Sequence, residues 1–392
     1  MKKEKIGLIE KLGFMSFSVA TNIVYSFRSN YYKYFLTGIL LINPVAASNI
    51  VLFGTIWDVI NDPLVGTWAN NIKFKSGEKI RPWLLWSALP FALGMILIFT
   101  DFNVSEKYDI ILAVLCFFIF ELINTFRGIP FNGMTALATS DDSQRESING
   151  FRSMGAALGV GIGSILVPMI IKMFGGLKDH KVINSTDSSA MFKTAVSMGV
   201  LIVAGCLIHY FTTKERVKQV SNNEEKISLV EAYRMLFNCK SWILNMLYIM
   251  TYGIVTTLGS SVLIYYCSYV INDTSKASFI MIFYLIASII VSPLTSKIDA
   301  WLGRKKTMTL AAIIMIIGRV PLFIDNLSMT ANIIAVTSVG IGTAMAFVSF
   351  NTNRNKIADI IEVKNGRRID AVVSTADNLA TKIAEAIVDK GF

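Results

Sequence analysis

Long apolar stretches recur along the whole chain, separated by short polar segments. Each stretch holds about 20 residues, enough to cross the ~30 Å hydrocarbon core of a bilayer as an α-helix. The expected spans are Gly13–Leu36, Pro44–Trp68, Pro82–Thr100, Ile110–Ala138, Phe151–Phe174, Ala190–Thr212, Trp242–Val270, Ala277–Ile298, Met308–Ile324, Ile333–Ile357 and Val372–Phe392. The pattern therefore predicts an all-α polytopic membrane protein with about 11 visible spans.

The composition supports this prediction. Of the 392 residues, 53% are hydrophobic and only 16% are charged, whereas soluble domains carry about 25% charged residues. The four cysteines form no CxxC pair, and His180 and His209 are the two histidines. We therefore expect no zinc site, no histidine-based catalytic triad and no cofactor. Because no covalent chemistry is implied, the chain is not expected to be an enzyme.

The basic residues follow the expected topology. If the N-terminus is cytoplasmic, the inside gaps are rich in lysine and arginine, and the first outside gap has no charge. The inside residues are Lys73, Lys75, Lys79, Arg81, Lys214, Arg216, Lys218, Lys226, Arg304, Lys305, Lys306, Lys364, Arg367 and Arg368. This positive-inside bias predicts a multi-pass plasma-membrane protein with a cytoplasmic N-terminus. The net charge of +10 then reflects topology and attraction to the lipid bilayer, and nucleic acid is not an expected partner.

A long polar segment divides the chain into two halves. We expect an N-terminal six-helix bundle over residues 1–212, a cytoplasmic central loop over 213–241 and a C-terminal bundle over 242–392. Apolar residues at helical spacing predict an amphipathic helix on the inner leaflet within the loop. They are Leu229, Ala232, Tyr233, Leu236 and Phe237. The second bundle shows one span fewer than the first, so we expect it to be truncated before its last helix.

Four segments point to a known family. They read KLGFMSFSVATNIVYSFRSNYYKYFLTGILLINPVAAS, IWDVINDPLVGTWANNIKFKSGEKIRPW, RGIPFNGMTALATSDDSQRESINGFRSMGAALG and IADIIEVKNGRRIDAVVSTADNLATKIAEA. These segments resemble the glycoside–pentoside–hexuronide:cation symporters, the relatives of the melibiose carrier within the major facilitator superfamily. The resemblance implies a major facilitator fold, in which two helical bundles rock about a central cavity. It also implies uptake of a sugar driven by Na⁺, Li⁺ or H⁺.

Asp58 and Asp62 are the candidate cation ligands. They lie four residues apart in an apolar span, so both side chains project from one face of the helix. Each unpaired charge at this depth would cost about 2.5–3.5 kcal/mol on insertion scales. A bound Na⁺ would offset that cost, or one carboxylate would take a proton. Asn61 and Thr125 match further cation-site positions of the melibiose-carrier type. The alternative is that Asp58 or Asp62 pairs with an intramembrane arginine and binds no ion.

The substrate positions depart from the melibiose pattern. Where that carrier places sugar-binding acids, this chain has Asn22 and Gly128, and its stacking tryptophan position reads Asn132. Arg152 matches the family's basic partner, and Lys382 matches a lysine near the cavity. The chain therefore lacks the carboxylates through which, by that resemblance, a galactoside would be recognised.

Two arginines that the melibiose pattern lacks suggest an acidic substrate. Arg28 and Arg127, with Asp58, Asp62 and Glu121, give two positive and three negative side chains, a sum of −1. One bound cation would bring the sum to zero and leave both guanidinium groups for an anion, because arginine pairs with carboxylates through two parallel hydrogen bonds. The alternative is internal pairing, with Arg127 on Asp58 or Asp62 and Arg28 extending outward along its span.

We expect a monomeric secondary transporter that couples Na⁺ or H⁺ to the symport of a small-molecule substrate. That substrate is a sugar or glycoside, with an acidic one favoured by the arginines, and the mechanism is alternating access. The rival hypotheses are a non-transporting membrane sensor or degenerate carrier, and a carrier of an amphipathic lipid or peptide. Independently of function, the small-residue ladder Gly155, Gly159 and Gly163 predicts close packing of its helix against a neighbour.

Overall fold

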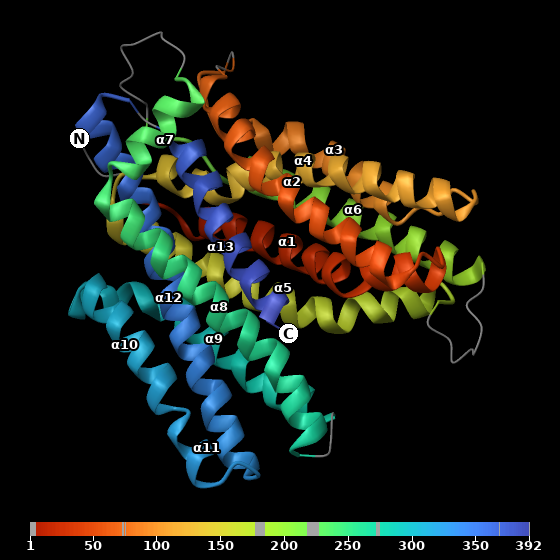
Figure 1. Ribbon diagram of the computed structural model, residues 1–392. Coiled ribbons are helices and arrows are strands. Elements are labelled where there is room, and N and C mark those ends of the chain that lie inside the picture. Colours follow the sequence, from red (N-terminus) through yellow and green to blue (C-terminus); the bar gives the residue numbers. More distant parts are fainter. Residues whose placement is uncertain are drawn as a thin grey trace.

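The computed structural model describes residues 5–72, 74, 76–176, 185–217, 227–271, 275–367 and 369–391. Helices dominate these ranges, and no strand occurs in them (Figure 1). The helices are α1 (Leu8–Tyr34, continued by the π-helical turn η1, Phe35–Ile39), α2 (Pro44–Asn71), α3 (Trp83–Ile98), α4 (Glu106–Ala138), α5 (Asp142–Met173), α6 (Ser185–Thr212), α7 (Leu229–Phe237), α8 (Lys240–Tyr269), α9 (Ser275–Leu302), α10 (Arg304–Ile317), α11 (Val320–Ile324), α12 (Met329–Asn365) and α13 (Asp370–Gly391). The all-α prediction is confirmed.

Each expected span falls on one helix, with one exception. The ninth span is divided into α10 and α11 by Gly318 and Arg319. Within the described part of the chain, α4, α5, α6, α9, α10 with α11, and α12 are long and apolar enough to cross a membrane. Several helices extend beyond the expected apolar spans, because their polar ends continue the same hydrogen-bond ladder outside the apolar stretch.

Local sequence explains where several helices begin and end. Asn43 caps α2 by accepting a hydrogen bond from the backbone N–H of Val45, and Pro44 occupies the first turn, where its missing N–H is tolerated. Asp141 caps α5 in the same way. Gly366 ends α12 in the left-handed conformation, with φ of 68°.

The glycine ladder of α5 packs against α1, as the sequence predicts. A Cβ atom added at Gly155 would lie 2.5 Å from the carbonyl oxygen of Met15, and one at Gly159 would lie 2.6 Å from that of Val19. Such distances leave no room for a side chain. The two backbones therefore approach as closely as small residues allow, which is the usual basis of helix association in lipid.

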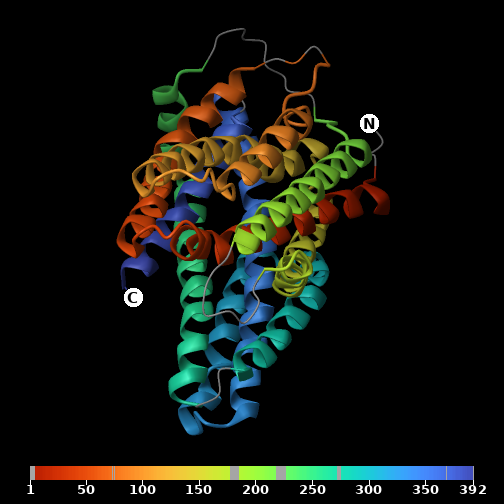
Figure 2. The same ribbon diagram turned by 90° about the vertical axis from the view of Figure 1, so that its right-hand side faces the viewer.

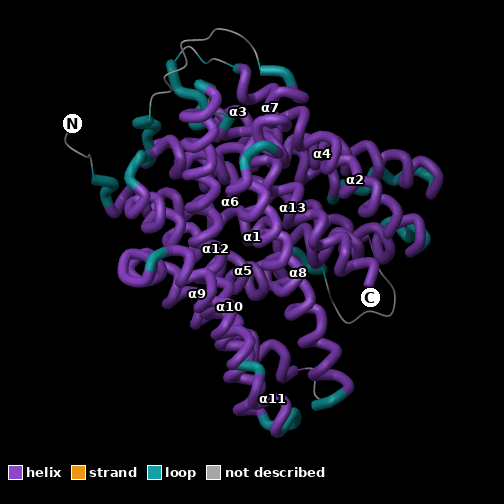
Figure 3. Tube along the Cα trace, turned by 60° about the vertical axis from the view of Figure 1, so that its left-hand side comes forward, coloured by secondary structure: helices purple, strands orange, loops and turns teal. Residues whose placement is uncertain are grey.

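The helices diverge from one end of the molecule. Helices α5 and α9 pack side by side, as do α2 and α13, so these pairs join the first half of the chain to the second. Away from these contacts, α8 to α11 extend in a different direction from α2, α3, α4 and α6 (Figures 1 and 2). The N-terminus and α7 lie where the two groups converge, and α11 lies at a far tip (Figure 3). We call the converging region the α7 end.

Helix α7 is the amphipathic helix that the apolar stripe predicts. Its N-cap is Ser228, whose side chain accepts from the backbone N–H of Glu231. Ala232 and Leu236 are fully buried and pack in an apolar cluster that includes Ile361 of α12. The helix therefore packs on the protein with Ala232 and Leu236, whereas Phe237 of the same stripe and Val230 on another face stay exposed.

Candidate functional site

Asn61, Asp62 and Thr125 form a buried polar cluster between α2 and α4. The hydroxyl of Thr125 donates to Asp62 Oδ1 at 2.7 Å, and Asn61 Nδ2 donates to Thr125 Oγ1 at 2.9 Å. The three residues are only 1%, 0% and 4% exposed, respectively. Pro63 follows directly in α2 and, lacking an N–H, interrupts the helical hydrogen-bond ladder beside the cluster. The structure thus brings together three of the four predicted cation-site residues.

Asp58 is the fourth of these residues. It lies in α2 one turn before Asp62, on the same helical face. Its side chain is outside the described residues, so its place in the cation site stays a prediction.

Arg28 of α1 pairs with Glu121 of α4. The carboxylate is 2% exposed, and the guanidinium group also lies over the rings of Tyr25 and Phe120, at 5.8 Å and 5.6 Å. Arg28 therefore turns toward a carboxylate in the protein and does not extend outward along its helix, which was the alternative considered from the sequence.

Arg127 is surrounded by neutral groups. Its Nε and Nη2 donate to Asn124 Oδ1 at 3.2 Å and 2.8 Å, and its Nη1 donates to Thr21 Oγ1 at 3.2 Å. The guanidinium group lies 4.9 Å from the centre of the Phe91 ring. Among the described side chains, no carboxylate pairs with Arg127, so pairing with Asp62 is not observed.

Arg152 of α5 is buried with neutral partners. Its Nη1 donates to Asn149 Oδ1 at 3.0 Å and lies 3.4 Å from Thr135 Oγ1, and the group stands over the Phe131 ring at 4.6 Å. Its Nη2 is buried without a hydrogen-bond partner in the described part of the protein. A buried guanidinium group that lacks a counter-charge is energetically costly.

Asn132 connects the first half of the chain to the second. Arg354 of α12 donates from Nη1 to Asn132 Oδ1 at 3.1 Å and to Asn351 Oδ1 at 2.9 Å. Its Nε donates to Asp377 Oδ2 of α13 at 2.6 Å, and Asp377 is fully buried. The position expected to contact substrate is therefore bonded to an arginine of the opposite half.

The remaining predicted substrate residues are less informative. Asn22 donates to the carbonyl of Ser18 in its own helix at 2.8 Å and packs against Gly159. Gly128 is buried in α4. The side chain of Lys382 in α13 lies outside the described residues, and its role stays a prediction.

The charges described so far do not balance. The positive groups are Arg28, Arg127, Arg152 and Arg354, and the negative ones are Asp62, Glu121 and Asp377. Four positive and three negative side chains sum to +1 before the undescribed Asp58 and Lys382 are counted. Arg28 and Arg354 each have a carboxylate partner, so the excess positive charge lies with Arg127 and Arg152.

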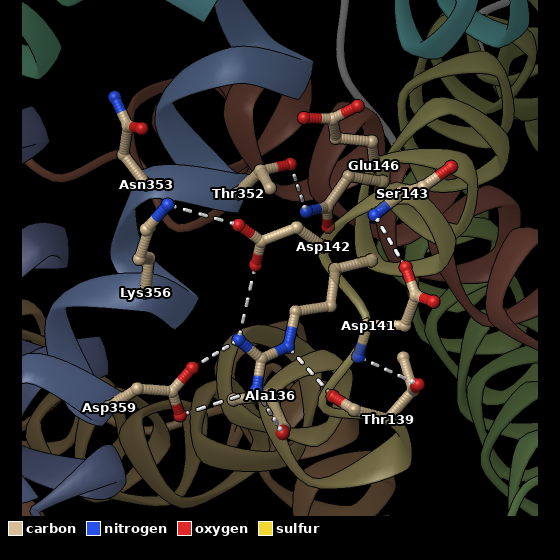
Figure 4. Close-up of polar contacts among 12 residues, drawn as sticks. Ala136, Thr139, Asp141, Asp142, Ser143, Glu146, Thr352, Asn353, Lys356 and Asp359 are labelled. Carbon is tan, nitrogen blue, oxygen red and sulfur yellow. Dashed lines mark hydrogen bonds and ion pairs between the residues drawn. The ribbon is translucent and has the colours of Figure 1, made fainter. Parts of the chain in front are cut away.

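Polar contacts join the two halves at the α7 end (Figure 4). Arg145 of α5, with a side chain that is 0% exposed, forms an ion pair with Asp359 of α12 and donates to the carbonyl oxygens of Thr139 and Ala136 at 2.7 Å and 3.1 Å. On the outer side, Lys356 Nζ lies 3.2 Å from Asp142 Oδ2. The ends of α5 and α12 are thereby held together.

A second ionic contact lies beside the first. Arg304, at the start of α10, pairs with Glu146 of α5 and lies 3.8 Å from Asp299 of α9. Asn149 and Thr352 are bonded across the same interface at 3.0 Å. Because both contacts cross between the halves, this end can open only if they break.

Sequence reasoning did not single out Arg145, Arg354 or Asp359. Arg354 lies in the polar run FNTNRNK within the tenth expected span, and an ionisable residue inside a span is by itself a sign of function. Arg145 and Asp359 lie near the ends of spans, where charged residues are common, so composition gave no reason to pair them.

Comparison with known proteins agrees with this architecture. The family model described as MFS/sugar transport protein matches residues 13–388. The uncharacterized symporter YnaJ of Bacillus subtilis (strain 168) is 27% identical over 80% of this chain and 66% of its own length, so the chain spans about two thirds of that relative. The isoprimeverose transporter of Lactiplantibacillus pentosus is 25% identical over 98% of this chain and 79% of its own.

A solved structure shows the same fold at low sequence identity. The major facilitator superfamily transporter FucP in the outward conformation superimposes with a TM-score of 0.71, at 13% identity, over 98% of this chain and 90% of that one. The packing of α1 to α6 against α8 to α13 is therefore a major facilitator fold. Since the family model covers nearly the whole chain, this multi-pass membrane protein belongs to the MFS/sugar transport family.

Proposed function

We propose that the protein is a cation-coupled symporter of a sugar or glycoside, works by alternating access and carries out no covalent chemistry. The observation that carries the proposal is the buried cluster of Asn61, Asp62 and Thr125. Both curated relatives described above are named as a symporter or a transporter.

The chemistry of the cluster suits a hard cation or a proton. The Asp62 carboxylate and the Thr125 hydroxyl meet at one buried point, where the Asn61 amide donates to the hydroxyl, and oxygen ligands of this kind suit Na⁺. Among the described residues, no group of three or more His, Cys, Asp or Glu side chains is placed to hold a metal ion. A site with one described carboxylate and neutral oxygens fits a singly charged ion, Na⁺ or H⁺.

The shape of the molecule supports alternating access. We infer that the α7 end is cytoplasmic, in agreement with the positive-inside bias, and that residues 1–212 and 242–392 are the two moving bundles. The helices diverge away from this end (Figure 1), and Arg145–Asp359 and Arg304–Glu146 hold it closed. Opening toward the cytoplasm would require these pairs to separate.

The uncompensated arginines favour an acidic substrate. Arg127 and Arg152 are held by neutral groups among the described side chains, with Arg152 Nη2 buried and unsatisfied. A carboxylate on the substrate would supply the missing hydrogen bonds and counter-charge. The cation at Asp62 and the anion at the arginines would then enter together with little change in net charge.

A binding screen tests the proposal. Purified protein would be titrated with neutral and acidic glycosides, each in Na⁺, in choline and at two pH values. We expect at least one glycoside to bind, with an affinity that rises with Na⁺ or with protons. If no glycoside binds under any condition, the sensor or lipid-carrier alternatives replace this proposal.

A further inference from the structure

Tyr233 is a partly buried aromatic residue of helix α7. Tyr233 lies on the docked face of α7, and its hydroxyl is buried without a partner of full hydrogen-bond geometry in the described part of the chain. Burying a hydroxyl in this way costs about 1–3 kcal/mol by mutational data. Packing alone therefore does not explain a tyrosine at this position, because a phenylalanine would fill the same space without this cost.

Two packing contacts connect Tyr233 to the part of α2 that contains Asp62. The first is α13, because Tyr233 packs against the apolar cluster that includes Ala376, the neighbour of the fully buried Thr375. The second is Gly66 of α2, which packs directly on Thr375, since a Cβ there would lie 2.3 Å from Thr375 Oγ1. Gly66 is one helical turn from Asp62 on the same face of α2.

Electrostatics agree with this placement. Burial is the main cause that raises the pKa of Tyr233 above its ordinary value, and the Asp62 carboxylate raises it further, while Thr375 lowers it. This direction agrees with the packing of Tyr233 on α13 and of α13 on Gly66, which together place the phenol on the Asp62 side of α7.

Contacts join α7 and the residues just before it to both halves of the chain. Asn71, the last residue of α2, exchanges two hydrogen bonds with the backbone of Ile227, at 2.9 Å and 3.0 Å. Glu231 pairs with Arg367, after α12, at 2.7 Å. The helix can leave its position only when contacts to both halves break.

We propose that Tyr233 is a positioning residue for cation coupling, whose hydroxyl stabilises Asp62 when the cation is absent and thereby ties the docking of α7 to the empty site. This inference rests on the proposed function. A phenol that donates toward a carboxylate lowers the free energy of the empty, charged site more than that of the filled, neutralised site. The cation and the docked α7 therefore compete for Asp62.

The first test measures cation binding without a substrate. The thermal stability of the purified full chain would be titrated with Na⁺ and with Li⁺ at constant ionic strength, using choline as the replacement. Tyr233→Phe removes only the hydroxyl, and we expect the Na⁺ midpoint to fall at least threefold. Tyr32→Phe is the matched control, because Tyr32 of α1 also buries a hydroxyl without a hydrogen-bond partner in the described part of the chain.

The second test follows α7 itself. Ala232→Cys places a thiol on the fully buried face of α7, and the four native cysteines are all buried. Its reaction with a hydrophilic maleimide should be faster in Na⁺ than in choline. In the Tyr233→Phe background, Na⁺ should no longer change the rate. Val230→Cys, which lies on the exposed face, should react quickly throughout.

The outcomes separate this inference from the function on which it rests. If Asp62→Asn removes the Na⁺ dependence but Tyr233→Phe leaves the midpoint unchanged or raises it, the role of Tyr233 is overturned and the cation site stands. An equal effect of Na⁺ on Ala232→Cys in both backgrounds overturns the link to α7. If neither Na⁺ nor Li⁺ affects the unchanged protein, this inference fails, and the symporter proposal survives only in its proton-coupled form.

Discussion

Single charged side chains inside the spans carry most of the functional information. Asp62, Arg127 and Arg152 were identifiable from the sequence because an ionisable residue in an apolar span needs a reason to be there. The ion pairs among the buried charges were not identifiable. Arg28 and Glu121 are 93 residues apart, and Arg354 and Asp377 are 23 apart. Which arginine meets which carboxylate depends on the rotation of two packed helices, which hydrophobic periodicity alone does not define.

At the scale of single residues, Arg127→Ala tests whether the protein binds an anionic group of its substrate. If Arg127 meets an anion, the variant should weaken an acidic glycoside at least tenfold and leave a neutral analogue nearly unchanged. Truncating one partner of a buried charge pair costs about 2–5 kcal/mol, so tenfold, which is about 1.4 kcal/mol, is a conservative threshold. Isothermal titration of both ligands gives the comparison.

The control for this prediction is Na⁺ binding to the same variant. If Arg127 instead acts on the cation site, Arg127→Ala would change the Na⁺ or pH dependence and weaken both glycosides alike. That result would contradict an anionic substrate at Arg127 and would leave the carrier assignment in place.

At the scale of elements, apolar stretches predicted the helices well, because a segment in lipid has few alternatives to an α-helix. The division of the ninth span was not predicted, since Gly318 and Arg319 give a weak signal inside an apolar run. The amphipathic stripe of α7 correctly indicated a helix. It did not show that the stripe faces protein, because a lipid surface and an apolar protein surface select the same residues.

Helix packing supplies a prediction about the glycine ladder. Gly159→Ala should destabilise the protein, because its Cβ would lie 2.6 Å from the backbone oxygen of Val19. Overpacking of this kind typically costs about 1–3 kcal/mol. Gly161→Ala is the matched control, since its Cβ would meet only the end of the Leu285 side chain, at 3.0 Å. Thermal unfolding in detergent should show a lower Tm for the first variant. Equal Tm values would contradict the close contact of α1 and α5.

At the scale of the whole molecule, two groups of helices are joined at one end by ion pairs. The sequence indicated the two halves through its long central polar segment. It could not indicate which end is closed, because the same chain must form both conformations and the difference between them is a small rotation of packed surfaces. Arg145 and Asp359, 214 residues apart, are in contact in the arrangement described here.

Breaking the buried pair should open the α7 end. Asp359→Asn leaves the guanidinium group of Arg145 buried without its main counter-charge, and loss of one partner from a buried pair costs about 3–5 kcal/mol. A thiol placed by Thr352→Cys, which is 0% exposed, should then react with a hydrophilic maleimide at least tenfold faster.

Lys356→Gln provides the comparison for that experiment. It removes a pair with Asp142 in which the lysine side chain is 55% exposed, and exposed pairs contribute about 0–1 kcal/mol. The labelling rate should stay near that of the unchanged protein. Similar rates for Asp359→Asn and Lys356→Gln would contradict a closing role for Arg145 and Asp359.

Uphill accumulation tests the central claim most directly. The protein and its Asp62→Asn variant would be reconstituted in liposomes with a glycoside found by the binding screen, under an inward Na⁺ or proton gradient. We predict that the unchanged protein concentrates the glycoside, and that Asp62→Asn abolishes concentration while retaining downhill exchange, because the proposed substrate contacts lie on other residues. Gradient-driven accumulation by Asp62→Asn at the level of the unchanged protein would contradict coupling at this site.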